Sequence, residues 1–168
     1  MADKYIDNNS GVLTEKSGTT ASLGAGDAGK IVALDSSGRL DQTMMPVGVV
    51  PETASITASE ALTAGNLVNV YSNAGTANCR KADATTAGKE AHGFVLTSVS
   101  SGATALVYFE GTNTALSGLT PGKQYLSTTA GSTTTTAPSS SGNVVQVVGY
   151  AVSATAMSFQ STLPIVLA

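Results

Sequence analysis

The chain contains 168 residues and has a mass of 16.7 kDa, which suits one ordinary domain or a small domain with an arm. Charged residues make up 11% of the sequence and the formal net charge is −3. This composition excludes a highly charged disordered tail and a protein that binds nucleic acid by neutralising phosphates. Val, Ile, Leu and Phe together account for 36 residues, which predicts a modest hydrophobic core.

Cysteine content and hydropathy exclude two further classes. Cys79 is the single cysteine, so no disulfide can form within the chain. No apolar run approaches the roughly 18 residues that cross a bilayer. Residues 1–10 carry charges and lack an apolar stretch, unlike a signal peptide. We therefore expect a soluble protein that is made in a cytoplasm and has neither a membrane nor a nucleic acid as partner.

The charge distribution divides the chain into two regions. Ten of the nineteen charged residues precede Gln42, and after Glu110 only Lys123 is charged. Residues 1–50 are rich in Gly, Ser and Asp and contain only short apolar stretches, and two prolines mark their end. These apolar residues are too few for a separate core. The region is predicted to be an extended arm that becomes ordered on a partner surface; a flexible leader is the alternative.

The candidate contact residues of this arm are its apolar side chains, separated by Gly-rich polar spacers. They are Val12, Leu13, Ile31, Val32, Leu34, Leu40, Met44, Met45 and Pro46. Within the arm, residues 34–40 combine Asp, two Ser and Gly between apolar residues. This pattern predicts a tight turn between two short extended segments.

From residue 53 onward the sequence predicts strands joined by turns. Residues 67–71 are rich in strand-forming side chains, and Pro121-Gly122 indicates a type II turn before residues 124–127. Three hairpins are predicted. They pair residues 94–99 with 105–109, the two halves of the Thr-rich segment 128–136, and residues 143–152 with 156–159.

Short strands separated by turns every 8–12 residues or so predict a small antiparallel β-barrel or sandwich over residues 51–168. No long window has a helical period, and Gly88 weakens the best helix candidate, residues 82–89. Residues 106–109 and 144–148 are apolar on both faces. Their second face packs either against another copy of the chain or a different partner, or between two layers of one domain.

Residues typical of catalysis or metal binding are sparse. His92 and Cys79 have no partner at metal-ligand spacing, and we interpret both as structural, with a Cys–His nucleophile pair as the alternative. The carboxylates of the second region are scattered, and no Trp accompanies them as a sugar platform. They are Glu52, Glu60, Asp83, Glu90 and Glu110. The sequence therefore predicts neither a cofactor, nor a metal, nor an enzyme.

One segment of the arm has the spacing of a phosphate-binding loop. Gly24, Gly29 and Lys30 match its glycine and lysine positions. Ile31, however, stands where the metal-binding hydroxyl is required, and no strand-and-helix pattern flanks the segment. We interpret the match as a coincidence within a Gly-rich arm.

Several segments resemble bacteriophage structural proteins. Residues 28–41 (AGKIVALDSSGRLD), followed by Met44-Met45-Pro46, resemble a segment of phage head and tail accessory proteins. Residues 80–95 (RKADATTAGKEAHGFV), with residues 101–105 and 118–127, are similar to a β module of phage capsid decoration (head cement) proteins. Related modules occur in tail fibre and collar proteins. The resemblance covers nearly the whole chain and rests on turns and core residues.

This resemblance implies a non-enzymatic virion protein that binds the outer capsid surface and stabilises the head lattice. It implies a homotrimer whose arm, residues 1–50, lies across subunits of the major capsid protein. A tail-fibre, collar or baseplate adaptor is an alternative from the same class. A small hydrolase or lectin-like carbohydrate binder carried on the virion is an alternative from another class, and it requires aromatic residues or clustered carboxylates in a concave site, of which the sequence offers few.

Overall fold

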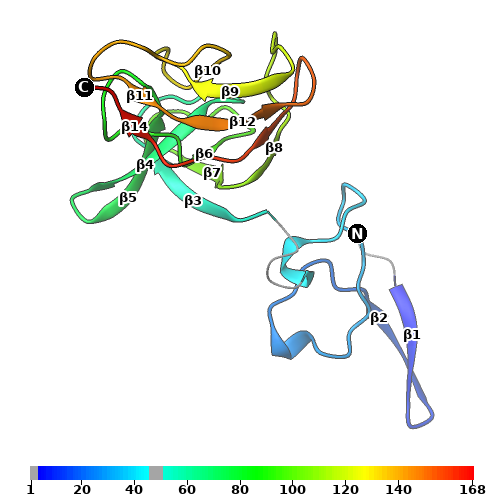
Figure 1. The fold of residues 1–168 in the computed structure, drawn as a ribbon. Helices are drawn as coiled ribbons and strands as arrows, with labels where there is room; N and C mark the ends of the chain where they lie inside the picture. Colours follow the sequence, from blue (N-terminus) through cyan, green and yellow to red (C-terminus); the bar gives the residue numbers. More distant parts are fainter. Residues whose placement is uncertain (1–3, 46–50) are drawn as a thin grey trace. The chain divides into compact units, whose positions relative to one another are not determined.

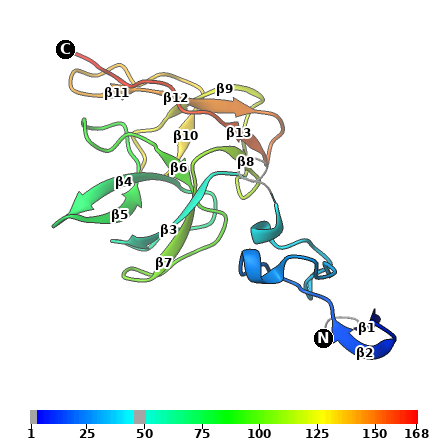
Figure 2. The same ribbon diagram turned by 90° about the horizontal axis from the view of Figure 1, so that it is seen from below.

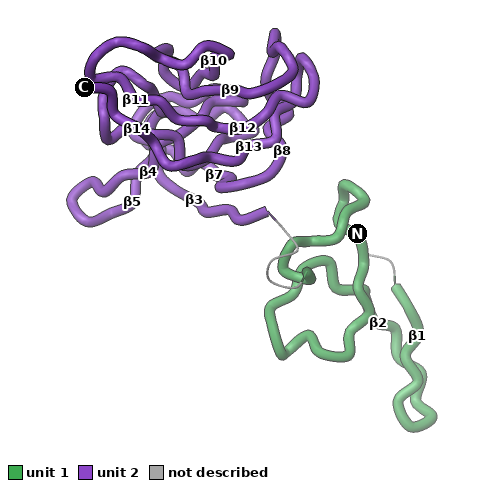
Figure 3. Tube along the Cα trace, in the orientation of Figure 1, with its two compact units in different colours: residues 1–50 green, residues 51–168 purple. Residues whose placement is uncertain are grey.

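A computed structural model describes residues 4–45 and 51–168 (Figure 1). The chain divides into two compact units, Met1–Val50 and Pro51–Ala168, coloured green and purple in Figure 3. The fold is all-β, as the sequence predicts, and in the described residues the helical structure is limited to two short 3-10 turns. We call the first unit the N-terminal unit and the second the β domain.

The β domain begins with a closed five-stranded barrel. Its strand order is β3-β5-β4-β6-β7, with β3 (Thr53–Ala58), β4 (Leu67–Asn73), β5 (Thr76–Lys81), β6 (Gly93–Phe94) and β7 (Thr104–Tyr108). Strands β3 and β5 run parallel, and the other neighbours are antiparallel. The β4–β5 hairpin turns through Ala74 and Gly75, both at positive φ, and its tip projects from the barrel (Figures 1 and 2).

A second sheet lies beside the barrel in the same unit (Figure 2). Its order is β10-β9-β12-β13-β8, with β8 (Gly111–Asn113), β9 (Gly122–Leu126), β10 (Thr133–Thr134), β12 (Val147–Ala151) and β13 (Met157–Phe159). A two-stranded pair, β11 (Val144–Val145) with β14 (Ile165–Val166), continues from one end of it.

Two hydrophobic clusters lie on opposite sides of β4. Successive strand residues point to opposite faces, so Val68 joins the barrel interior while Leu67 joins the cluster between barrel and sheet. Phe94 stacks on Tyr108 with ring centroids 5.4 Å apart and tilts against Phe159 at 5.5 Å. Full burial of a side chain of this kind contributes about 1.5–3 kcal/mol, so these contacts fix the barrel against the sheet.

A bulge in β12 depends on one glycine. The register with β9 shifts between Val147 and Gly149, and Gly149 has φ 145°. A β-carbon at this position would lie 2.0 Å from the Ser158 carbonyl oxygen. Any side chain at this position would clash with β13, so the close approach of β12 and β13 requires glycine here.

The N-terminal unit is built from local structure. β1 (Lys4–Asn9) and β2 (Val12–Ser17) form a hairpin, and Thr19 bridges to Val32. Two 3-10 turns, η1 (Ala25–Asp27) and η2 (Gln42–Met44), follow. Of the described residues 4–45, none is buried. The sequence predicted that this region lacks a separate core, but it did not predict the hairpin.

The structure confirms some predicted hairpins and corrects others. Strand β12 pairs with β13, as predicted for residues 143–152 and 156–159, although residues 144–145 separate as β11. The strand predicted over residues 94–99 is too long, because strand β6 ends at Phe94. Prediction of a hairpin within residues 128–136 was wrong: β10 pairs with β9, and residues 127–132 form the loop.

The two-sided apolar runs have different surroundings. In residues 144–148, Val144 and Val148 are buried and their neighbours are half-buried, so much of that run packs inside the domain. In β7, Val107 is buried while Leu106 is 39% exposed. The predicted turn at residues 34–40 is present: Asp35 N donates to Arg39 O at 2.8 Å. Residues 82–89 form a loop rather than a helix.

Candidate functional site

The only histidine and the only cysteine of the sequence do not form a catalytic pair. Cys79 lies fully buried in the barrel cluster, and burial raises the pKa of its thiol, which disfavours the nucleophilic thiolate. His92 is exposed just before β6, and its Nδ1 accepts a hydrogen bond from Val70 N at 3.1 Å. The structure therefore places the thiol inside the barrel and bonds the imidazole to a backbone amide.

The phosphate-loop match in the arm is a self-contained turn. Asp27 Oδ2 accepts a hydrogen bond from Leu23 N at 2.6 Å, and Asp27 Oδ1 pairs with Lys30 Nζ at 2.5 Å. The backbone bond from Leu23, followed by the Lys30 bond, lowers the pKa of the Asp27 carboxyl. The Asp27 carboxylate therefore already pairs with the lysine that a bound phosphate would need.

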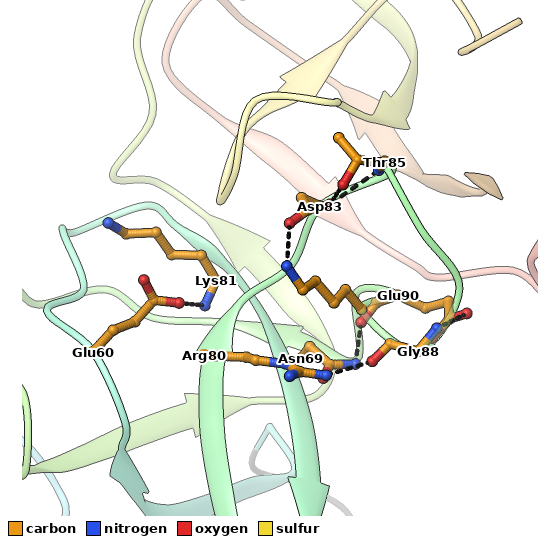
Figure 4. A network of polar contacts seen from close by, with 9 residues as sticks. Glu60, Asn69, Arg80, Lys81, Asp83, Thr85, Gly88 and Glu90 are labelled. Carbon is orange, nitrogen blue, oxygen red and sulfur yellow. Dashed lines mark hydrogen bonds and ion pairs between the residues drawn. The ribbon is translucent and has the colours of Figure 1, made fainter. Parts of the chain in front are cut away.

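Most of the scattered carboxylates accept hydrogen bonds from the chain near residues 80–90 (Figure 4). Glu60 accepts from Lys81 N at 2.8 Å, and Glu90 accepts from Gly88 N at 2.9 Å. Asp83 accepts from Thr85 N at 2.9 Å and from Lys89 Nζ at 3.2 Å. Within the described residues, no three His, Cys, Asp or Glu side chains gather as a metal site.

Asp83 is the most enclosed of these carboxylates. Burial alone raises the pKa of its carboxyl, but the hydrogen bonds from Thr85 and the ion pair with Lys89 outweigh burial and lower the pKa below its ordinary value. The Asp83 carboxylate is therefore charged at neutral pH, where it holds Thr85 and Lys89 in place and is a poor general acid.

The loop that contains Asp83, residues 82–89, is joined to both the barrel and the second sheet of the β domain. Arg80 Nη2 donates to Gly88 O at 2.7 Å and its guanidinium lies 4.3 Å from the Tyr71 ring centre. Ala84 N donates to Ser127 O, and Val144 N donates to Ala84 O. Residues 80–95 thus connect the barrel and the second sheet through backbone bonds and the buried Ala84.

The predicted contact residues of the arm are solvent-exposed apolar side chains. Val12, Leu13, Ile31, Val32, Leu34 and Leu40 are 50–68% exposed. Met44 and Met45 are half-buried, and Pro46 lies outside the described residues. The structure adds Ile6, 63% exposed, and Leu23, 93% exposed, which the sequence analysis missed because each stands alone between polar residues.

The two faces of the β1–β2 hairpin differ. The register places Ile6 and Leu13 on one face, beside the Lys4–Glu15 ion pair. The opposite face carries the Lys16–Asp7 pair and borders a hollow of about 580 Å³ that Lys30 also lines. Hydrogen bonding to Asp7 raises the pKa of the Lys16 ammonium, so the Lys16 side chain faces this hollow in its charged form.

No protein-family model, curated protein or solved structure matches this chain. Across residues 4–45 and 51–168, the structure contains no helix with the length and apolar character needed to span a membrane.

Proposed function

We propose that this protein is a non-enzymatic virion component that binds the outer surface of a phage capsid and stabilises the head lattice, as a homotrimer. The observation that carries the proposal is the exposure of apolar side chains in the N-terminal unit, which is the predicted arm. Its apolar side chains project from a unit in which no described residue is buried. Such side chains gain stability only when a partner covers them.

The major capsid protein is the proposed partner of this arm. Covering a Val, Leu or Ile side chain completely contributes about 1.5–3 kcal/mol, and ordering the Gly-rich spacers offsets part of that gain. Each arm therefore binds modestly. Three arms per trimer, repeated over a closed lattice, multiply the effect through avidity. Binding to the assembled lattice also opposes the release of single capsid subunits by mass action.

The β domain has a different role in this proposal. Its clusters supply stability without a partner, and the Asp83 loop connects its two halves. The domain would sit on the outside of the virion as a compact cap. The sequence resemblance to capsid decoration modules, in residues 80–95 and 118–127, supports this placement.

Immunogold electron microscopy of intact virions tests the proposal. The antibody is raised against residues 51–168, and preimmune serum provides the control. Dense label over the head is the expected result. Label confined to the tail would overturn the capsid assignment in favour of a fibre, collar or baseplate adaptor, and unlabelled virions from producing cells would overturn any virion role.

A further inference from the structure

Charged residues are distributed unevenly within the β domain. Residues 51–110 contain eight charged side chains, whereas residues 111–168 contain one, Lys123. Globular proteins carry charges at about a quarter of their positions, so a free surface over residues 111–168 would normally hold many more. Depletion of charge is a property of surfaces that become buried between protein subunits.

The large apolar side chains that are exposed in this half all lie on one antiparallel ribbon, residues 143–167. At one end Ala151 pairs with Met157; at the other, Leu167 N donates to Asn143 O at 2.9 Å. Between them, Thr162 N donates to Val147 O at 2.9 Å, so β13 continues into β14 along β12 and β11. The exposed side chains are Tyr150, Val152, Leu163, Ile165 and Val166.

One edge of this ribbon is open. Strand β8 covers β13 from Met157 to Phe159, whereas in the described part of the chain β14 has β11 as its sole strand partner. Residues 160–166 are all exposed. Isolated edges are usually protected by charged side chains, prolines or bulges. Residues 157–168 contain no charge, and Pro164 removes only one backbone donor.

We propose that residues 143–167 form the contact between copies of this chain, with the open edge at residues 160–167 lying against a second copy. Identical surfaces that carry a net charge repel each other, whereas this ribbon has no charged side chain of its own. Lys123 lies opposite Tyr150, and Glu90 lines a hollow with residues 161–164, so the charged neighbours of the ribbon are one of each sign. The inference deepens the proposed function, because it names the surface through which the proposed trimer assembles.

Self-association of the purified full-length chain tests this assignment. Light scattering after size exclusion and native mass spectrometry measure the assembly over a wide range of concentration. The variants are Ile165→Lys and Tyr150→Lys, both at exposed positions of the ribbon. The matched control is Leu106→Lys, an exposed apolar residue of β7 in the charged half. Circular dichroism melts compare the folding of all four proteins.

We expect the wild-type chain and the Leu106→Lys control to assemble alike, and each ribbon variant to raise the dissociation constant about ten-fold or more, because a buried lysine lacks a partner. A wild-type chain that stays monomeric, or ribbon variants that assemble like the control, overturns the proposal. If the ribbon variants fail to fold, hydrogen exchange on wild-type protein decides: amides of residues 160–167 must gain protection in the assembly, and unchanged exchange overturns it.

The outcome is separable from that of the proposed function. Self-association is measured without capsids, so assembly through the ribbon by a protein that never labels a virion would contradict the virion role alone. Label over the head by a chain that remains monomeric in solution and on the capsid would contradict the ribbon contact and the homotrimer, but would leave the capsid-binding role standing.

Discussion

The two units use similar amino acids in opposite ways. In the N-terminal unit, isolated apolar residues stand among Gly, Ser and Asp, and none of residues 4–45 is buried. In the β domain, inward apolar residues alternate with outward Thr and Ser along strands such as β3, and they close two clusters that both include residues of β4. The comparison teaches that the spacing of apolar residues, more than their number, decides which unit forms its own core.

The N-terminal unit is held by contacts that contribute little in water. Lys4 and Glu15 form an ion pair whose side chains are 53% and 55% exposed, and such pairs are weak because solvent screens them. Asp41 accepts hydrogen bonds from the Thr43 hydroxyl and backbone, which lower the pKa of its carboxyl. A two-stranded hairpin is itself marginal in water. The unit therefore has local shape without a core.

The largest effect on stability should come from the cluster between barrel and sheet. Phe94→Ala removes a ring that is 1% exposed and contacts two other aromatic rings. The expected loss in the free energy of unfolding is about 3–5 kcal/mol, measured by urea denaturation. The matched change Leu106→Ala, at a partly exposed site of β7, should cost about 0.5–1 kcal/mol. Equal losses would contradict the two-cluster description.

A smaller loss is expected at the bulge of β12. Gly149→Ala combines positive φ with a 2.0 Å approach to the Ser158 carbonyl, and should cost about 3 kcal/mol. Gly142→Ala also has positive φ, at 81°, but meets nothing within 4 Å, and should cost about 1 kcal/mol. The difference between the two losses, measured by thermal unfolding, is the cost of the steric clash. A larger loss for Gly142→Ala than for Gly149→Ala would show that β12 and β13 do not lie so close together.

The Asp83 loop should make the stability of the β domain depend on pH. A carboxyl whose pKa is lower in the folded state stabilises the fold above its unfolded pKa, about 3.9, and that contribution is lost as pH falls through the folded pKa. Asp83→Asn should cost about 1 kcal/mol at neutral pH, and its difference from wild type should shrink in acid. Denaturation series at several pH values measure this.

The loop offers its own control for that experiment. Lys89→Met removes the ion pair but leaves both bonds from Thr85 to Asp83, so it should cost less than Asp83→Asn. A difference between wild type and Asp83→Asn that stays constant from neutral pH into acid would contradict the role given to this carboxylate.

The smallest effect on stability is expected in the arm. Leu13→Ser and Ile31→Ser change side chains that are 68% and 54% exposed, so the unfolding free energy should stay within about 0.5 kcal/mol of wild type. Capsid binding should nevertheless weaken, as co-sedimentation would measure. Thr14→Ser, an exposed change in the same hairpin, is the control and should bind normally. Normal binding by all three variants would remove these side chains from the contact.

Alternating apolar residues and turn signals made the all-β fold and the β12–β13 pairing predictable from the sequence. The closure of the barrel was not, because a strand has the same pattern whether its neighbour is parallel, as β3 is to β5, or antiparallel. The register of residues 128–136 failed because a run of Thr and Ser looks alike in every register. The β1–β2 hairpin was missed because both its faces are exposed, which leaves no alternation to read.

The sequence could identify the candidate contact residues as apolar, but it could not show which of them share a face. Val12, Leu13 and Leu34 are exposed as an arm requires, but the sequence could not show that Ile6 shares a face with Leu13, since that depends on the hairpin register. The open ribbon edge was likewise beyond the sequence. Residues 144–148 and 165–166 are equally apolar, and only the fold buries most of the first run and exposes the second.

Quantitative co-sedimentation with undecorated phage heads compares the full chain with a deletion of residues 2–46. We expect the full chain to saturate the heads, and the truncated chain to melt like the intact β domain and stay in the supernatant. If the truncated chain folds and sediments with the heads as tightly as the full chain, the exposed arm does not bind the capsid.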